Sequence, residues 1–161
     1  YKQDTGPALY RRSIYVFLKR TAPTPFMANF DAPNRETFCT RRERSNTPLQ
    51  ALQLMNDVQH FEAARRLAER ILTEAGATPA ERITFAYRVI LARSPEAAEL
   101  AIVERVLTKH RERFKADPKA AQQAISLGES KPDPKLPAEE LAAYTLLANL
   151  LLNLDETVTR N

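Results

Sequence analysis

The sequence predicts a mainly α-helical protein, an irregular bundle of about five to six helices that follows an extended, proline-rich N-terminal arm. Three observations support this fold class. Helix-capping residues stand directly before proline at four expected helix starts after residue 46, and proline is tolerated at the first helical position. Only three Gly accompany eleven Pro among 161 residues. Apolar residues also recur every three or four positions over long stretches, which indicates helices with one buried face.

The arm is expected to comprise residues 1–46. Residues 13–18 are rich in β-branched and aromatic side chains, so this segment is predicted to be a short strand, although a helix also fits. Three prolines between residues 21 and 34 favour an extended path. Residues 37–42 are then the one candidate partner strand. We expect either a small β-hairpin or an irregular arm packed on the bundle.

Residues 47–161 are expected to form the bundle, which together with the arm makes one domain. Thr47 precedes a proline and stands three positions before Gln50, the spacing of a capping box. Thr78 and Glu81 repeat that arrangement. Both threonines are therefore predicted to begin helices.

Apolar periodicity places two helices after the first cap. One stripe runs from residue 58 to residue 75, and Gly76 follows as a left-handed stop. The second stripe predicts a helix over residues 79–93. Both helices should present one apolar face to the core.

The remaining helices follow from two further cap-proline pairs. Ser94 and Asp117 each precede a proline and are predicted to cap helices, the second of which ends near Gly128. Residues 128–137 contain three prolines and are predicted to be a surface loop. Residues 141–154 are apolar on almost every side, so we place this helix at the centre of the bundle.

Positive charge is concentrated near the N-terminus. Residues 1–56 contain nine Lys/Arg and four Asp/Glu, a net charge of +5, whereas residues 57–161 contain fifteen and sixteen, a net charge of −1. A basic surface of this kind fits nucleic acid, an anionic polysaccharide, a membrane surface or an acidic neighbouring domain. The longest apolar stretch, residues 146–154, is far shorter than the ~20 residues that span a bilayer, so no membrane span is predicted.

The sharpest candidate site lies where the basic arm meets the first capped helix. Arginine side chains and a helix N-terminus both suit a phosphate, sulfate or carboxylate group. The candidate ligand-binding residues are Asp31, Arg35, Arg41, Arg42, Arg44, Asn46 and Thr47. In the alternative interpretation, these arginines pair with the acidic side chains of Asp31, Glu36 and Glu43 and pin the arm to the bundle.

No catalytic, cofactor or metal site is predicted. Asp31 and Glu36 lie in a loop with no defined gap between their carboxyl groups, and Cys39 with His60 lacks a third catalytic group. His60 and His110 are the only histidines, too few for a metal site without carboxylates from other elements. Cys39 is the single cysteine, which excludes an internal disulfide, and we expect it to be buried.

Several strings of residues resemble a planctomycete-type C-terminal domain of unknown function, of the PSD-one type, over essentially the whole chain. They are Arg12 to Tyr15, Asn29 to Glu36, Asn46 to Leu52, Asn56-Asp57, Glu62 to Arg65, and Leu152 to Glu156. The resemblance implies a module of large exported proteins, located in the periplasm or at the cell surface, that often carry a cytochrome-c-like domain upstream. Any haem would belong to that domain, because this chain has no haem-attachment motif.

We therefore expect a structural or interaction module without an enzymatic activity of its own. The chain begins without an initiator Met or a signal segment, as expected for a piece of a longer protein. Its expected partners are other domains of that protein, and an anionic polysaccharide fits the implied location better than nucleic acid does. The alternative is that Asp31 and the arginines complete the active site of an upstream domain that acts on polysaccharide.

Overall fold

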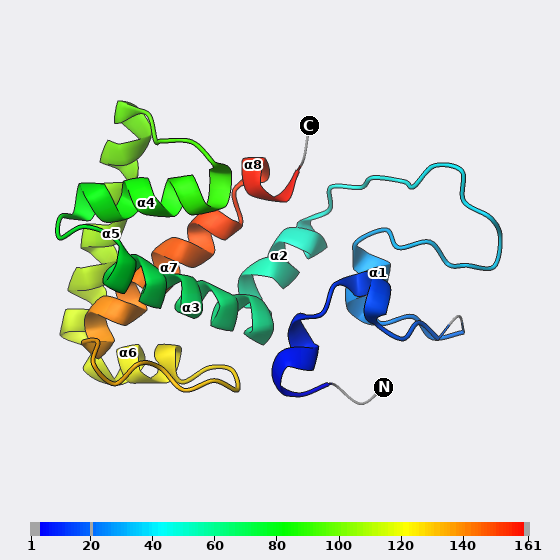
Figure 1. Cartoon of the computed structure of the whole chain (residues 1–161), viewed down its shortest axis with the longest axis horizontal. Coiled ribbons are helices and arrows are strands. Elements are labelled where there is room, and N and C mark those ends of the chain that lie inside the picture. Colours follow the sequence, from blue (N-terminus) through cyan, green and yellow to red (C-terminus); the bar gives the residue numbers. More distant parts are fainter. Residues whose placement is uncertain (1–3, 20, 160–161) are drawn as a thin grey trace. The chain divides into compact units, whose positions relative to one another are not determined.

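A computed structural model describes residues 4–19 and 21–159 of the chain. In that part the chain forms eight α-helices and two short 3-10 helices and no β-strand (Figure 1), which confirms the mainly α-helical fold. The chain divides into two compact units, residues 1–54 and residues 55–161. Within the described residues, no helix is both long enough and apolar enough to cross a lipid bilayer.

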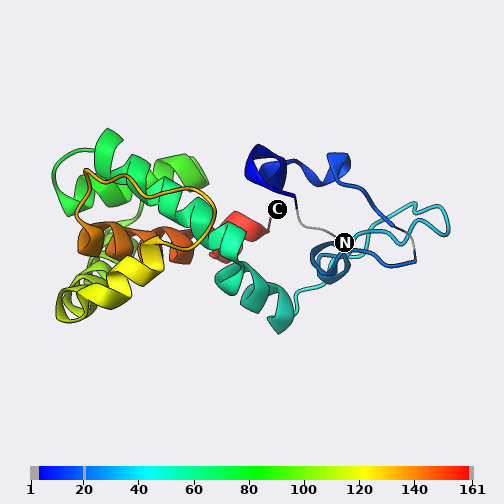
Figure 2. The same ribbon diagram turned by 90° about the horizontal axis from the view of Figure 1, so that it is seen from below.

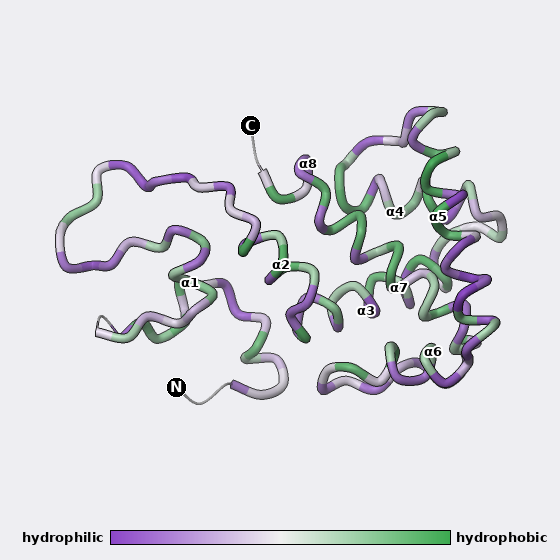
Figure 3. Tube along the Cα trace, turned by 180° about the vertical axis from the view of Figure 1, so that it is seen from behind, coloured by the Kyte–Doolittle hydropathy of each residue, from purple (hydrophilic) through white to green (hydrophobic). Residues whose placement is uncertain are grey.

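The first unit consists mostly of loops. Its helical elements are η1 (Gly6–Tyr10), η2 (Ser13–Tyr15), α1 (Pro25–Asn29) and the greater part of α2 (Pro48–Asn56). Met27 is the one apolar side chain that is buried among the described residues of this unit. Figure 3 shows mainly hydrophilic residues along the connection between α1 and α2. This unit therefore has almost no hydrophobic core of its own.

The predicted strand over residues 13–18 is wrong. Residues 13–15 form a 3-10 turn in which the Tyr15 amide donates to the Arg12 carbonyl at 2.9 Å. Residues 37–42 are irregular as well, so the hairpin does not form. A strand is stabilised by packing one face against a neighbour. Ile14 and Tyr15 are instead 73% and 70% exposed, and β-forming side chains without such a surface do not make a sheet.

The predicted start of α2 at Pro48 is confirmed. The Thr47 amide donates to Gln50 Oε1 at 3.2 Å, and the Gln50 amide donates to Thr47 Oγ1 at 3.3 Å. These are the two reciprocal bonds of a capping box. The next helix, α3 (Val58–Glu74), begins after Asp57, whose carboxylate accepts from the amides of Gln59 and His60.

The predicted left-handed stop at Gly76 is wrong, although α3 does end just before it. Gly76 has no positive φ, and the Glu81 side chain fills the space where a Cβ would stand. Glu81 lies there because it closes the capping box with Thr78 that begins α4 (Pro79–Leu91). The left-handed residue of this region is instead Ala92, with φ of 57°, directly after α4. Gly76 is thus small for a steric reason rather than for its φ.

The predicted cap at Ser94 is also wrong. Helix α5 (Ala97–Ala116) begins after Glu96, whose amide donates to the Glu99 side chain at 2.7 Å. Asp117 caps α6 (Pro118–Ile125) as predicted, accepting from the Ala120 amide at 3.0 Å. A capping residue followed by proline is therefore a strong signal for a nearby helix start. The exact start can still shift by a few residues where a carboxylate, here that of Glu99, accepts another backbone amide.

The predicted central helix is confirmed as α7 (Ala138–Leu152). It packs against α3, α5 and α6, and Figure 2 shows it among the other helices of the second unit. Its buried residues point to several sides of the helix: Leu141, Ala142, Ala143, Tyr144, Thr145, Leu147, Ala148, Asn149 and Leu151. A short helix not predicted from the sequence, α8 (Asp155–Val158), follows. Helices α3 to α7 thus form a bundle around one apolar core.

Candidate functional site

The candidate residues of the first unit lie on one loop whose ends are joined. We define the arginine loop as residues 31–45. The Ser45 amide donates to Asp31 Oδ2 at 2.7 Å, and Ser45 Oγ donates to Asp31 Oδ1 at 2.9 Å. These bonds, the backbone bond first, hold the pKa of Asp31 below its ordinary value. Asp31 and Ser45 thus join the two ends of this surface loop, and binding residues are found disproportionately on loops whose ends are fixed by a scaffold.

Gln50 fixes the base of the arginine loop from α2. Its Nε2 donates to the Asn29 carbonyl at 2.7 Å and to Ser45 Oγ at 2.9 Å. Asn29 Nδ2 in turn donates to Gln53 Oε1 at 2.7 Å. Gln50 is buried, so these polar contacts are shielded from water and contribute more than exposed ones. The end of α1, the end of the loop and the start of α2 are thereby held together.

The four arginines of the loop are exposed and do not pair with acidic side chains. Arg35, Arg41, Arg42 and Arg44 form no ion pair with any carboxylate in the part of the chain that the structure describes. Asp31, the acidic side chain expected to pair with them, is instead held by Ser45. The loop therefore does not show the ion pairs that the alternative interpretation expects. Hydrogen bonds of Ser45 and Gln50 close the loop instead.

The remaining two candidates lie at the junction with α2. Asn46 is exposed, and the Thr47 hydroxyl already accepts the Gln50 amide. One of the donors at this helix N-terminus is thus occupied by the protein itself. The structure brings all seven candidates onto the loop and its junction, but it offers the arginines, rather than the helix N-terminus, to a ligand.

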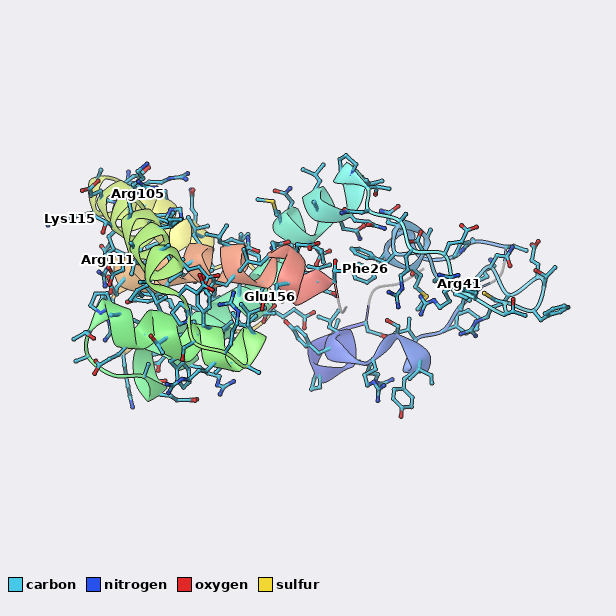
Figure 4. All side chains as sticks on the ribbon, turned by 90° about the horizontal axis from the view of Figure 1, so that it is seen from above. Phe26, Arg41, Arg105, Arg111, Lys115 and Glu156 are labelled. Carbon is cyan, nitrogen blue, oxygen red and sulfur yellow. The ribbon has the colours of Figure 1, made fainter. Side chains whose placement is uncertain are left out.

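The tip of the arginine loop presents two side chains that are not among the seven candidates. Phe38 is 91% exposed. Cys39 is exposed too, and its Sγ donates to the Arg41 carbonyl at 3.2 Å. The expectation of a buried cysteine is wrong, because this loop has no core in which to bury it. Figure 4 shows Arg41 with the other side chains of this loop.

A second exposed apolar group lies near the start of the chain. We define the apolar segment as residues 14–17. Ile14, Tyr15 and Phe17 in it are 73%, 70% and 75% exposed. Large apolar side chains are rarely exposed together on a protein surface unless a partner covers them.

In the second unit, a buried ion network ties helix α3 to the loop before α7. It consists of Glu62, Arg65, Glu69 and Ser130. Arg65 has no solvent exposure; it donates to Glu69 Oε1 at 2.7 Å and to the Ser130 carbonyl at 2.6 Å. Glu62 accepts the backbone amides of Glu129 and Ser130 at 2.8 and 2.9 Å.

The ion network forms hydrogen bonds with backbone groups of the proline-rich loop. Beyond the contacts above, Glu69 Oε1 accepts the Asp133 amide at 3.3 Å. The spacing of three and four residues between the charged side chains indicates contacts within α3, but nothing in the sequence identifies the loop as their partner. In the sequence, Glu62 and Arg65 contributed only to the family resemblance, and their structural role was not predicted.

Two further clusters pair charges between helices of the second unit. Arg93 makes two bonds to Glu99, both at 2.7 Å, and two to Glu156 in α8, at 2.8 and 2.7 Å. These bonds lower the pKa of Glu99 to about 2, with Arg93 as the largest cause. Because α8 holds Glu156, this cluster fixes the last helix of the described chain to the α4–α5 connection.

The other cluster surrounds Tyr144, which is completely buried. Arg82 and Arg111 lie over its ring at 5.6 and 5.5 Å, and both form ion pairs with Glu140. Figure 4 shows Arg111 beside α7. Burial raises the pKa of the Tyr144 hydroxyl, so it stays protonated at neutral pH. The cluster binds α4, α5 and α7 to one another and has its charges satisfied internally.

The histidines give no sign of a metal centre. The described residues contain no group of three or more His, Cys, Asp or Glu arranged to hold a metal ion. His110 is partly buried, and that burial lowers its pKa. His60 Nδ1 lies 3.1 Å from the Asp57 carboxylate that caps α3.

Fold and charge placement together define a class of protein: a helical scaffold with internally paired charges, joined to a loop-rich unit that exposes arginines and aromatic side chains. The sequence profile of the PSD1 family, described as "Protein of unknown function (DUF1553)", matches residues 1–107. The chain therefore belongs to this family, as its residues suggested, although the match ends within α5 rather than at the end of the chain. Comparison with curated proteins and with solved structures gives no significant match.

Proposed function

We propose that the chain is an interaction module rather than an enzyme, and that its apolar segment docks on another domain of a longer protein. One observation supports this most directly. Ile14, Tyr15 and Phe17 are at least 70% exposed in a unit whose described residues bury a single apolar side chain, Met27. Covering each of these side chains would contribute roughly 1.5–3 kcal/mol. Docking on a partner would be stabilised by that free energy, because the unit by itself leaves these side chains exposed.

The charged groups of the second unit support the same proposal, because they are paired within the protein. Its most buried charged groups, Arg65 and Glu62, are engaged with the loop before α7. Arg93 and Arg111 are likewise paired with carboxylates of other elements. Groups that are tied up in this way stabilise the scaffold and are not offered to a substrate. The longer protein is proposed to be exported, which rests on the family resemblance, and any haem would lie in an upstream domain.

Hydrogen–deuterium exchange tests the docking proposal. The 161-residue chain is compared with the longer protein that contains it, and the backbone amides of the apolar segment are expected to exchange more slowly in the longer protein. Replacing Ile14 and Phe17 with serine should restore fast exchange there. Ile102→Ser, at a 53% exposed position on α5, is the matched control. Equal exchange of the segment in both proteins would contradict the proposal.

A second function is favoured by the unpaired arginines: we propose that the arginine loop binds an anionic ligand. Arg35, Arg41, Arg42 and Arg44 are exposed and form no ion pair with a described carboxylate. They outnumber the acidic side chains of the loop, which are Asp31, Glu36 and Glu43. An anionic polysaccharide is one such ligand. The other alternative, a contribution to an upstream active site, has less support because these side chains are spread along an exposed loop instead of surrounding one buried group.

Salt-dependent retention on a sulfated polysaccharide column tests anion binding. Replacing Arg41, Arg42 and Arg44 with alanine should lower the salt concentration that elutes the chain. The control replaces Arg88, Arg105 and Lys119, three exposed cations of the second unit, and removes the same net charge. If both triple variants elute alike, retention reflects net charge only and the loop is not a binding site.

A further inference from the structure

We propose that the arginine loop attaches the protein to the surface of an anionic lipid membrane, with Phe38 entering the interface and arginines contacting lipid phosphates. This inference rests on the anionic-ligand binding proposed above for the same loop and names the ligand. It requires no membrane-spanning helix.

Phe38 is the feature of the loop that favours a membrane as the anionic partner. Its side chain is 91% exposed, the largest exposed fraction among the large apolar side chains of the described chain. A bilayer interface accepts a protruding aromatic ring without a preformed pocket. A nucleic acid can also stack a base on such a ring, so quenching by labelled acyl chains separates the two. A lone phenylalanine at the tip of a hydrophilic loop is thus placed where it enters a bilayer first.

The arginines lie at the right positions along the loop to act together with that ring. Arg41, Arg42 and Arg44 follow Phe38 by three to six residues, and Arg35 precedes it by three. Long arginine side chains can keep their charge at the phosphate level while the backbone approaches the interface. Each such cation adds electrostatic attraction to an anionic leaflet. The four arginines outnumber the exposed carboxylates of the loop, Glu36 and Glu43. The loop therefore combines an apolar anchor with net positive charge, the two signals that stable surface attachment needs.

The base of the loop favours insertion because its ends are already fixed. Asp31 accepts the amide and hydroxyl of Ser45, and Gln50 holds Ser45 from α2. A loop with a fixed base loses less conformational entropy on binding than a free tail does. Cys39 and Phe38 are the tip residues, and neither is covered by the protein.

Tryptophan fluorescence tests insertion directly, because the chain contains no Trp. The variant Phe38→Trp of the full chain is mixed with vesicles of phosphatidylcholine alone and with vesicles that also contain phosphatidylglycerol. With anionic vesicles its emission is expected to shift to the blue and to be quenched by bromine-labelled acyl chains. The variant Ile102→Trp, at an exposed position of α5, should show neither effect.

Vesicle co-sedimentation separates the two parts of the proposal. Phe38→Ser should weaken partitioning into anionic vesicles by about tenfold or more. Replacing Arg41, Arg42 and Arg44 with alanine should weaken it by about a hundredfold. Both changes are at exposed loop positions, and circular dichroism checks that each variant remains folded.

The outcomes distinguish failure of this inference from failure of the anionic-ligand proposal. Arginine-dependent binding with no blue shift of Phe38→Trp would overturn membrane insertion and leave an anionic ligand of another kind. A shift with sulfated polysaccharide but none with vesicles would likewise overturn it. Binding that is unchanged by the arginine substitutions would overturn both.

Discussion

Replacing the buried Arg65 tests the reasoning about the ion network. The variant Arg65→Met keeps a long side chain in the same space and removes the charge and the donors. The wild-type guanidinium donates to Glu69 Oε1, to the Ser130 carbonyl and to Ser130 Oγ at 2.6–2.7 Å, with no solvent exposure. Its loss leaves two buried carboxylates with fewer partners, and breaking such a buried pair costs about 3–5 kcal/mol.

The free energy of unfolding is measured by urea denaturation followed by far-UV circular dichroism. Arg70→Met is the matched control, because Arg70 lies on the same helix and pairs with Glu74 at 3.0 Å while both side chains are about half exposed. Exposed pairs of this kind contribute about 0–1 kcal/mol. A loss for Arg65→Met no larger than the loss for Arg70→Met would refute the network as a source of stability.

A triple variant decides whether the charges or the shape matter. Replacing Glu62 and Glu69 with glutamine in the Arg65→Met background removes the stranded negative charges as well. It should recover part of the lost stability, because a buried network replaced as a whole is far less destabilising than one left half complete. If the triple variant is less stable than Arg65→Met, backbone hydrogen bonds to the carboxylates dominate instead.

Three further predictions follow from single positions. Gly128→Ala should destabilise the chain by about 1–3 kcal/mol in urea melts, because φ is 97° and the added Cβ would meet the Glu62 carboxylate; an unchanged midpoint would contradict this. Ala92→Gly should stabilise by about 1 kcal/mol, because Ala92 adopts φ of 57°, and a lower melting temperature would show that the residue is not strained. The Arg93 contact lowers the pKa of Glu99 to about 2 from 4.5, so its stabilisation is present above pH 4.5 and is lost as the pH falls toward 2. The stability of Glu99→Gln should thus fall less steeply over that range in acid-unfolding curves, and parallel curves would refute the assignment.

Local signals in the sequence were enough to place most helices. Thr47 and Thr78 each show a capping residue, a proline and a reaching side chain within four positions, and both helix starts are as predicted. The all-apolar stretch that became α7 was also placed centrally with success. For the two capped helices, the interaction that decides the structure lies within one turn of the residues that signal it. For α7, the all-apolar composition itself signals burial on every side.

The errors arose where a side chain has a competing or a distant partner that no local pattern signals. Cap residues were misassigned at Ser94 because Glu99, which bonds Glu96, is also drawn into contact with Arg93. Arg65 and Ser130 are 65 positions apart, and no local pattern connects them. For the candidate site, the charge pattern of the sequence predicted a cluster of arginines before α2, and the structure places them on one loop. The closure of that loop by Asp31 and Ser45 depends on a chain path that only the structure reveals.

The contrast between the two units is itself an argument about where the protein acts. All buried apolar side chains of the described chain other than Met27 belong to residues 55–161, and the strongest ion pairs lie there too. The first unit keeps its form by hydrogen bonds such as those of Gln50 and Asp31. Net folding stability is a small difference between large terms, so a unit that leaves Phe17 and Phe38 uncovered gives up stabilisation of the kind that the second unit gains from its apolar core. Surfaces of that kind are retained in a protein when a partner, rather than the fold, uses them.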